Sequence, residues 1–173
     1  MQILLPIHIL VGIVALLGAA VSVLSEKGKK LHVLSGKTYF WSMVVNFFTA
    51  IPMSIISRNI FLSPIAVFSF HLALAGMRFA RNRKGVATTF DWIAVCWMIL
   101  SGVGTLILAA IYFLTSNTQY IVLLVFGFLA IALGYADFRS YKNASVTGKE
   151  RISRHLTNMM GGTIAVVTAV FCC

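Results

Sequence analysis

Four histidines, each in a different long apolar stretch, are the side chains best suited to hold a ligand: His8, His32, His71 and His155. Imidazole nitrogen binds haem iron and most transition metals. In membrane bundles, a b-type haem takes one histidine from each of two helices that face each other at similar depth. The histidines therefore predict a ligand site inside a helix bundle, with haem b or a transition metal as its occupant.

Depth along the predicted helices separates the histidines into two pairs. His32 and His155 fall near the ends where basic residues gather, and His8 and His71 form the outer pair. From the start of each stretch, His8 is about five residues deep and His71 about eleven, a difference of roughly 9 Å at 1.5 Å per residue. The inner pair matches better, so we expect His32 and His155 to approach each other.

Two carboxylates lie at the same predicted depth as the inner pair. Histidine and carboxylate are ligand types that transition metals accept. The candidate metal ligands are therefore His32, His155, Asp91 and Asp137. No His-x-x-x-His pair places two ligands on one helical turn, so the spacing does not select a particular metal.

Three further polar residues complete the candidate site, namely Asn46, Arg78 and Asn158. A structural interpretation competes with the ligand site. In it, the polar residues at the predicted membrane rim form ion pairs and helix caps, and His71 is a neutral histidine hydrogen-bonded to Asn46 or to a serine. The sequence indicates no catalytic residues, since it has no Gly-x-Ser-x-Gly elbow, no phosphate-binding loop and no cysteine next to a histidine.

The elements that carry these residues are predicted to be membrane spans. The chain is 60% apolar and 10% charged with a mean hydropathy of +0.94, whereas soluble domains are about 25% charged. A span needs roughly 20 mainly apolar residues. Six stretches meet that length: Ile3–Leu24, Tyr39–Ser57, Ile60–Ala80, Phe90–Leu114, Tyr120–Phe138 and His155–Cys173. The prediction is an all-α, six-transmembrane-helix bundle forming one domain over residues 1–173.

The charges predict the orientation of this multi-pass protein. Arg58 alone among the fourteen Lys and Arg residues lies outside the connections that follow the first, third and fifth stretches. Basic loops stay on the cytoplasmic side, so the N-terminus is expected outside and the protein in the cell inner membrane. Trp41 and Trp92 are expected in the interfacial aromatic belt. The basic loops are expected to meet the lipid bilayer at its anionic headgroups, and the net charge of +10 is not taken to indicate nucleic acid.

Small and polar residues recur at helical spacing in each stretch. Such residues let membrane helices approach closely, and steps of three and four place them on one face. The predicted faces are His8, Gly12, Ala15, Ala19, Ser22; His32, Gly36, Tyr39, Met43, Asn46, Ala50, Met53; Pro64, Phe68, His71, Ala75, Arg78; Asp91, Val95, Met98, Gly102, Thr105; Gly127, Ala130, Gly134, Asp137; and His155, Asn158, Gly162, Ala165, Ala169. The second face also predicts that its helix begins before the apolar core.

Five short motifs together resemble a family. They are IHILVG (7–12), KGKKLHVLSGKTYFW (27–41), HLALAGMR (71–78), DW (91–92) and RHLTNMMGG (154–162). Their order and spacing resemble an uncharacterised family of predicted bacterial inner-membrane proteins, catalogued as a domain of unknown function. The resemblance implies histidines matching His8, His32, His71 and His155, with Gly36 and Arg78 also matched. It implies a bacterial, polytopic protein and supplies no activity. Members often carry a further helix after the sixth span, whereas this sequence ends at Cys173.

The functional expectation is a His-based ligand site, haem b or metal, inside the bundle and serving membrane electron transfer. Two other classes remain open at this point. One is a transporter or channel for a small solute, and the other is a non-catalytic accessory subunit of a larger membrane complex. The small-residue faces suit either a single closed bundle or a homo-oligomer.

Overall fold

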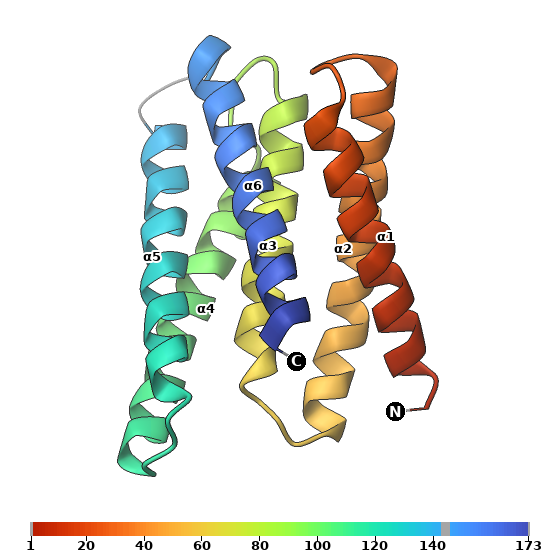
Figure 1. The fold of residues 1–173 in the computed structure, drawn as a ribbon. Helices are drawn as coiled ribbons and strands as arrows, with labels where there is room; N and C mark the ends of the chain where they lie inside the picture. The colour runs from red at the N-terminus through yellow and green to blue at the C-terminus, as the bar shows by residue number, and fades with distance from the viewer. Residues whose placement is uncertain (1, 143–145, 173) are drawn as a thin grey trace. The chain divides into compact units, whose positions relative to one another are not determined.

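Six helices make up the described part of the chain, which is residues 2–142 and 146–172, with side chains described as far as residue 167. The structure is a computed structural model. The helices are α1 (Leu4–Leu24), α2 (Lys30–Ile56), α3 (Leu62–Arg81), α4 (Thr89–Leu114), α5 (Tyr120–Lys142) and α6 (Gly148–Cys172), in that order along the chain (Figure 1). The all-helical class is therefore confirmed.

The helix ends differ from the apolar stretches in a consistent way. α2 begins at Lys30, well before the apolar core that starts at Tyr39, as its polar face predicted. α6 begins at Gly148 rather than at His155. A helix continues through polar residues until its backbone is capped, whereas an apolar stretch ends at the first charges. Gly28 and Gly85 have φ of 81° and 69°, a left-handed conformation that glycine adopts without strain, and each lies in a turn between helices.

Five of the helices, α1 to α5, are long and apolar enough to cross a membrane. The chain is thus a helical membrane protein by length and composition. Within the described residues, α6 is not among these helices. The predicted sixth span ends at Cys173, which lies outside the described residues, and the count of six spans stays a prediction.

The contacts divide the chain into two compact units. The first unit is Met1–Leu74 together with Asn158–Cys173, and the second is Ala75–Thr157. Both α3 and α6 contribute one part to each unit, so each unit is described separately below. The single domain over residues 1–173 stays a prediction.

In the first unit, α1 packs against α2 through small residues. A Cβ added to Gly18 would lie 3.1 Å from the backbone nitrogen of Tyr39, so only glycine allows this approach without movement of the neighbour. The predicted face of α1 is buried at Ala15 and Ala19. The apolar core of this unit draws on all four of its helical parts and consists of Ala15, Ala19, Tyr39, Met43, Ala73 and Val166.

The buried face of α2 differs from its predicted face. Tyr39 and Met43 are buried as predicted, but Ser35, Thr49 and Ser54 are buried where the prediction named their neighbours Gly36, Ala50 and Met53. The buried residues are Ser35, Tyr39, Ser42, Met43, Thr49 and Ser54. Ser35 and Thr49 donate their hydroxyl hydrogens to carbonyls of their own helix at 2.8 and 3.0 Å. A serine or threonine whose hydroxyl donates to a carbonyl of its own helix has a satisfied hydrogen-bond donor, so it can be buried like a small apolar residue.

In the second unit, α4 packs against α5 along the two faces that the sequence predicted. All of Asp91, Val95, Met98, Gly102 and Thr105 are buried on α4, and all of Gly127, Ala130, Gly134 and Asp137 on α5. A Cβ on Gly127 would lie 2.6 Å from Leu106, so the two helices approach at glycine. This face-to-face contact brings both predicted carboxylate ligands into the second unit.

Candidate functional site

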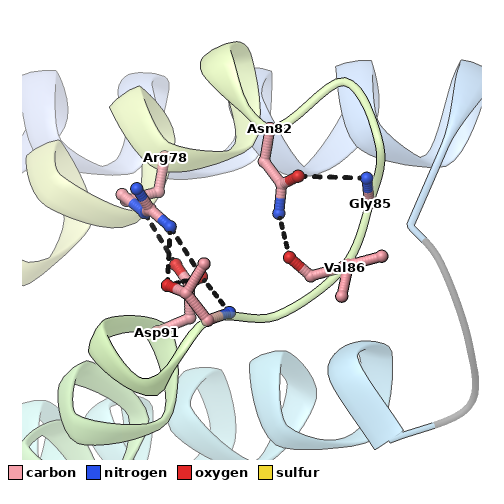
Figure 2. A network of polar contacts seen from close by, with 6 residues as sticks. Arg78, Asn82, Gly85, Val86 and Asp91 are labelled. Atoms are coloured by element: carbon pink, nitrogen blue, oxygen red, sulfur yellow. Dashed lines mark hydrogen bonds and ion pairs between the residues drawn. The ribbon is translucent and has the colours of Figure 1, made fainter.

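The buried carboxylate of Asp91, at the start of α4, is held by a network that we call the corner network, made of Arg78, Thr88 and Asp91 (Figure 2). Arg78 on α3 donates from Nε and Nη2 to the two carboxylate oxygens, each at 2.7 Å. Thr88 donates its backbone N–H at 2.8 Å and its hydroxyl at 2.7 Å to Oδ2. Asp91 is only 2% exposed, so its charge is compensated inside the protein by a bidentate pair.

The connection from α3 to α4 is held in one conformation by its own polar groups. Asn82 donates from its amide nitrogen to the carbonyl of Val86 at 2.8 Å and accepts from the backbone N–H of Gly85 at 3.1 Å (Figure 2). The carbonyl of Gly85 in turn accepts from the backbone N–H of Val146 at 3.2 Å. The loop is therefore tied to the segment that precedes α6.

Two arginines at the start of α6 donate to backbone carbonyls of neighbouring helices. Arg151 donates to the carbonyls of Phe79 and Ala80 at 3.1 and 2.7 Å, among the last carbonyls of α3. These carbonyls have no partner within their own helix. Arg154 donates to Ala136 on α5 at 3.2 Å and lies 3.9 Å from the carboxylate of Asp137. Within the second unit, the rim residues thus include the ion pairs and helix caps of the structural interpretation.

His155 lies beside Arg154 on α6 and makes its own contact with α3. Its Nδ1 lies 2.8 Å from the carbonyl oxygen of Gly76. A carbonyl oxygen only accepts, so Nδ1 must carry the hydrogen. In the neutral imidazole, the lone pair is then on Nε2, which is the form that a metal ligand needs.

His32, at the start of α2, is held in the same way within the first unit. Its Nδ1 lies 2.9 Å from the carbonyl oxygen of Ser22 on α1 and 3.2 Å from the hydroxyl of the same serine. The carbonyl again requires the hydrogen on Nδ1. Two of the candidate ligand histidines therefore share one tautomer, and each receives it from a backbone carbonyl of a neighbouring helix.

His8 on α1 contacts a hydroxyl of α2. Its Nδ1 lies 2.8 Å from the hydroxyl oxygen of Thr49 on α2. That hydroxyl has one hydrogen, and it is placed to donate it to the carbonyl of Val45 or of Asn46, each at 3.0 Å. One hydrogen therefore joins Nδ1 of His8 and the Thr49 hydroxyl, and either group is able to donate it.

His71 and Asn158 are the most deeply buried of the predicted polar residues in the first unit, at 3% and 2% exposure. His71 follows Phe70, whose ring stacks on that of Phe47 with centroids 4.7 Å apart. Among the described residues, the side-chain oxygen of Asn46 is buried and has no hydrogen-bond partner. The interior of this unit thus contains polar side chains from α2, α3 and α6.

The contacts decide which histidines of the first unit lie at one depth. His8 contacts Thr49 and His32 contacts Ser22, so the two histidines are separated along α1 by the rise from residue 8 to residue 22, about 21 Å. They cannot ligate one metal or haem.

The pairing of His32 with His155 stays a prediction, because the two residues belong to different units. The same holds for the metal site. Among the described residues, no group of three or more His, Cys, Asp or Glu side chains lies close enough to hold a metal ion. A metal at Asp91 would have to displace Arg78 from both carboxylate oxygens.

Sequence reasoning missed several residues of these networks. Thr88 and Asp91 have the Ser/Thr-x-x-acid spacing of a capping box, a signal that the sequence does carry. Arg151 and Thr49 have no comparable signal, because their partners are carbonyls or a histidine far away in the chain.

No protein-family model, curated protein or solved structure matches this chain.

Proposed function

We propose that this chain is a multi-pass protein of the bacterial inner membrane with six spans and its N-terminus outside, related to the inner-membrane family that its motifs resemble. Its histidines are proposed to hold haem b or a transition metal within the bundle, in the service of membrane electron transfer. The basic connections after α1, α3 and α5 support the orientation, since basic loops stay in the cytoplasm.

The tautomer of the histidines is the observation that carries the ligand proposal. Histidines that bind a metal usually donate their second ring N–H to a carbonyl or carboxylate, which orients the ring and raises its basicity. His32 and His155 each have Nδ1 at 2.9 Å or less from a backbone carbonyl of a neighbouring helix. Both rings are therefore oriented by a carbonyl of a neighbouring helix, and in the neutral imidazole this leaves the lone pair on Nε2.

The proposal names His32 and His155 as the first residues to test. The purified wild-type protein is expected to show a Soret band, or a bound transition metal in elemental analysis. His32→Ala and His155→Ala should each abolish the bound species while the protein still elutes as one folded peak. His8→Ala is the comparison variant, because His8 lies about 21 Å from His32 along α1, and it should retain the species held through His32 and His155.

Two results would overturn the ligand proposal. The first is a colourless and metal-free wild-type protein, which would leave the solute transporter or channel and the accessory subunit, and these are separated by whether partner proteins copurify. The second is a bound species that survives both substitutions while the unfolding midpoint falls, which would make His32 and His155 structural.

The six-span topology has its own test. Single cysteines placed in each connection, in a background without the native cysteines, are labelled with a membrane-impermeant maleimide from either side. Labelling of the connection between α1 and α2 (residues 25–29) from the outside would contradict the proposed orientation.

A further inference from the structure

One end of the second unit brings together the end of α3, the α3–α4 loop, the end of α5 and the start of α6. Arg151 of α6 donates to carbonyls at the end of α3. The ring of Phe79 on α3 stacks on Tyr141 near the end of α5, with centroids 5.4 Å apart. The α3–α4 loop is bonded to Val146. We call this end the basic corner, and it comprises residues 78–92, 137–142 and 146–154.

The charges that the basic corner presents outward are almost all positive. Its buried carboxylates, Asp91 and Asp137, lie against Arg78 and Arg154. Among the described residues of this unit, the one exposed carboxylate is Glu150. The exposed basic residues are Arg81, Arg83, Lys84, Arg139, Lys142 and Lys149. Internal pairing of the acids therefore leaves a cationic surface.

The loop from Asn82 to Val86 combines this charge with an apolar tip. Arg83 and Lys84 are exposed, and Val86, two residues on, is 63% exposed. The loop is held by the bonds of Asn82 to Gly85 and Val86, and the Val86 side chain points away from Asn82 (Figure 2). Two cations and one apolar side chain are thus presented by a fixed turn.

The neighbouring side chains are those of a membrane interface. Trp92 at the start of α4 contacts the rings of Phe138 and Tyr141 at 5.6 and 6.1 Å, and such aromatic groups gather at headgroup level. Phe90 and Ile93 on α4 are 50% and 60% exposed. Lipid acyl chains can cover the exposed apolar side chains of Val86, Phe90 and Ile93. A nucleic acid bound to the cations would leave these apolar side chains in contact with water, which is unfavourable.

We infer that the basic corner binds the headgroup of an anionic phospholipid, with Arg83 and Lys84 on the phosphate and Val86 at the boundary with the acyl chains. A lysine or arginine near an anionic membrane surface contributes about 1 kcal/mol, which is about fivefold in affinity. The inference uses the membrane placement of the chain and does not depend on haem or metal.

The test measures binding of fluorescent phosphatidylglycerol to the purified full chain in detergent, with phosphatidylcholine as the uncharged-headgroup reference. The Arg83→Gln/Lys84→Gln variant is expected to bind phosphatidylglycerol about 25-fold more weakly, from two fivefold effects. The matched control is Lys29→Gln/Lys30→Gln in the first unit, which removes the same charge beside Glu26, the partner of Lys29. It should keep most of the binding.

A third variant, Val86→Asn, leaves the charge unchanged and should weaken binding through the lost apolar contact. Equal losses in both double variants would overturn the inference in favour of unspecific charge attraction, as would no loss in either. Displacement of the lipid by millimolar inorganic phosphate, or by an RNA oligonucleotide, would overturn it in favour of those ligands. All three variants should keep the absorption spectrum of the wild-type protein. Lipid binding and haem or metal binding are therefore measured separately, and the failure of one proposal can be distinguished from the failure of the other.

Discussion

Replacing Gly102 by alanine tests the close contact between α4 and α5. The new Cβ would lie 2.8 Å from Cγ1 of Ile131, 3.1 Å from Cβ of Ala130 and 3.1 Å from the carbonyl oxygen of Gly127. Ile131 can shift its side chain, whereas the carbonyl oxygen moves only if α5 moves. An added methyl group in a packed interior costs about 1–3 kcal/mol, so Gly102→Ala is expected to destabilise the protein.

Gly104, two residues along the same helix, is the matched control. A Cβ at Gly104 meets nothing within 4 Å, and the residue is exposed. Both substitutions gain the same helix propensity, about 1 kcal/mol for glycine replaced by alanine. The difference between the two variants therefore isolates the packing cost, and Gly102→Ala should be the less stable by about 1–3 kcal/mol.

Unfolding of both variants in mixed micelles of SDS and dodecyl maltoside, followed by circular dichroism, measures this difference. Gly102→Ala should unfold at a lower SDS fraction than wild type, and Gly104→Ala at the same or a higher one. If the two variants unfolded at the same SDS fraction, α4 and α5 would not be as close as the structure has them at Gly102.

Two further substitutions test the polar contacts by the same unfolding assay. Arg78→Ala removes the three hydrogen bonds that the arginine donates to Asp91 and Thr88 and leaves the buried carboxylate without a cation, at a cost of about 3–5 kcal/mol, whereas Arg81→Ala at an exposed site should be close to neutral; equal effects would refute the internal pairing. Thr49→Val removes the hydroxyl that contacts His8 and should cost about 1 kcal/mol, whereas Thr38→Val, whose hydroxyl donates to Leu34 of its own helix, should change little; no difference between them would contradict the hydrogen bond between His8 and Thr49.

Much of the fold could be predicted from the sequence, because a membrane helix can be recognised from the length of its apolar stretch. α1 begins at Leu4 and α4 at Thr89, each within one residue of the predicted stretch. The buried faces of α4 and α5 were also predictable, since glycine, alanine and threonine recur there every three or four residues. The recurrence of small residues every three or four positions is a property of one helix, so it can be recognised in the sequence without knowing which helix packs against that face.

The buried face of α2 was less predictable, because hydroxyl residues can be exposed or buried at similar cost when they bond to their own helix. Ser35 and Thr49 do so, and they share the interior with Tyr39 and Met43. Composition therefore could not rank them against Gly36 or Ala50. Packing against α1 decided the choice.

Only the tertiary structure decided what each candidate site residue contacts. The carbonyl oxygens of Ser22 and Gly76 hold His32 and His155, and Arg151 reaches the carbonyl of Ala80 from 71 residues away. Every residue carries a backbone carbonyl, so no side-chain pattern marks those that will accept such a bond. The sequence by itself determined which residues are able to bind a ligand, and helix packing determined the tautomer and orientation of their rings, because a hydrogen bond between helices exists only when both helices are in place.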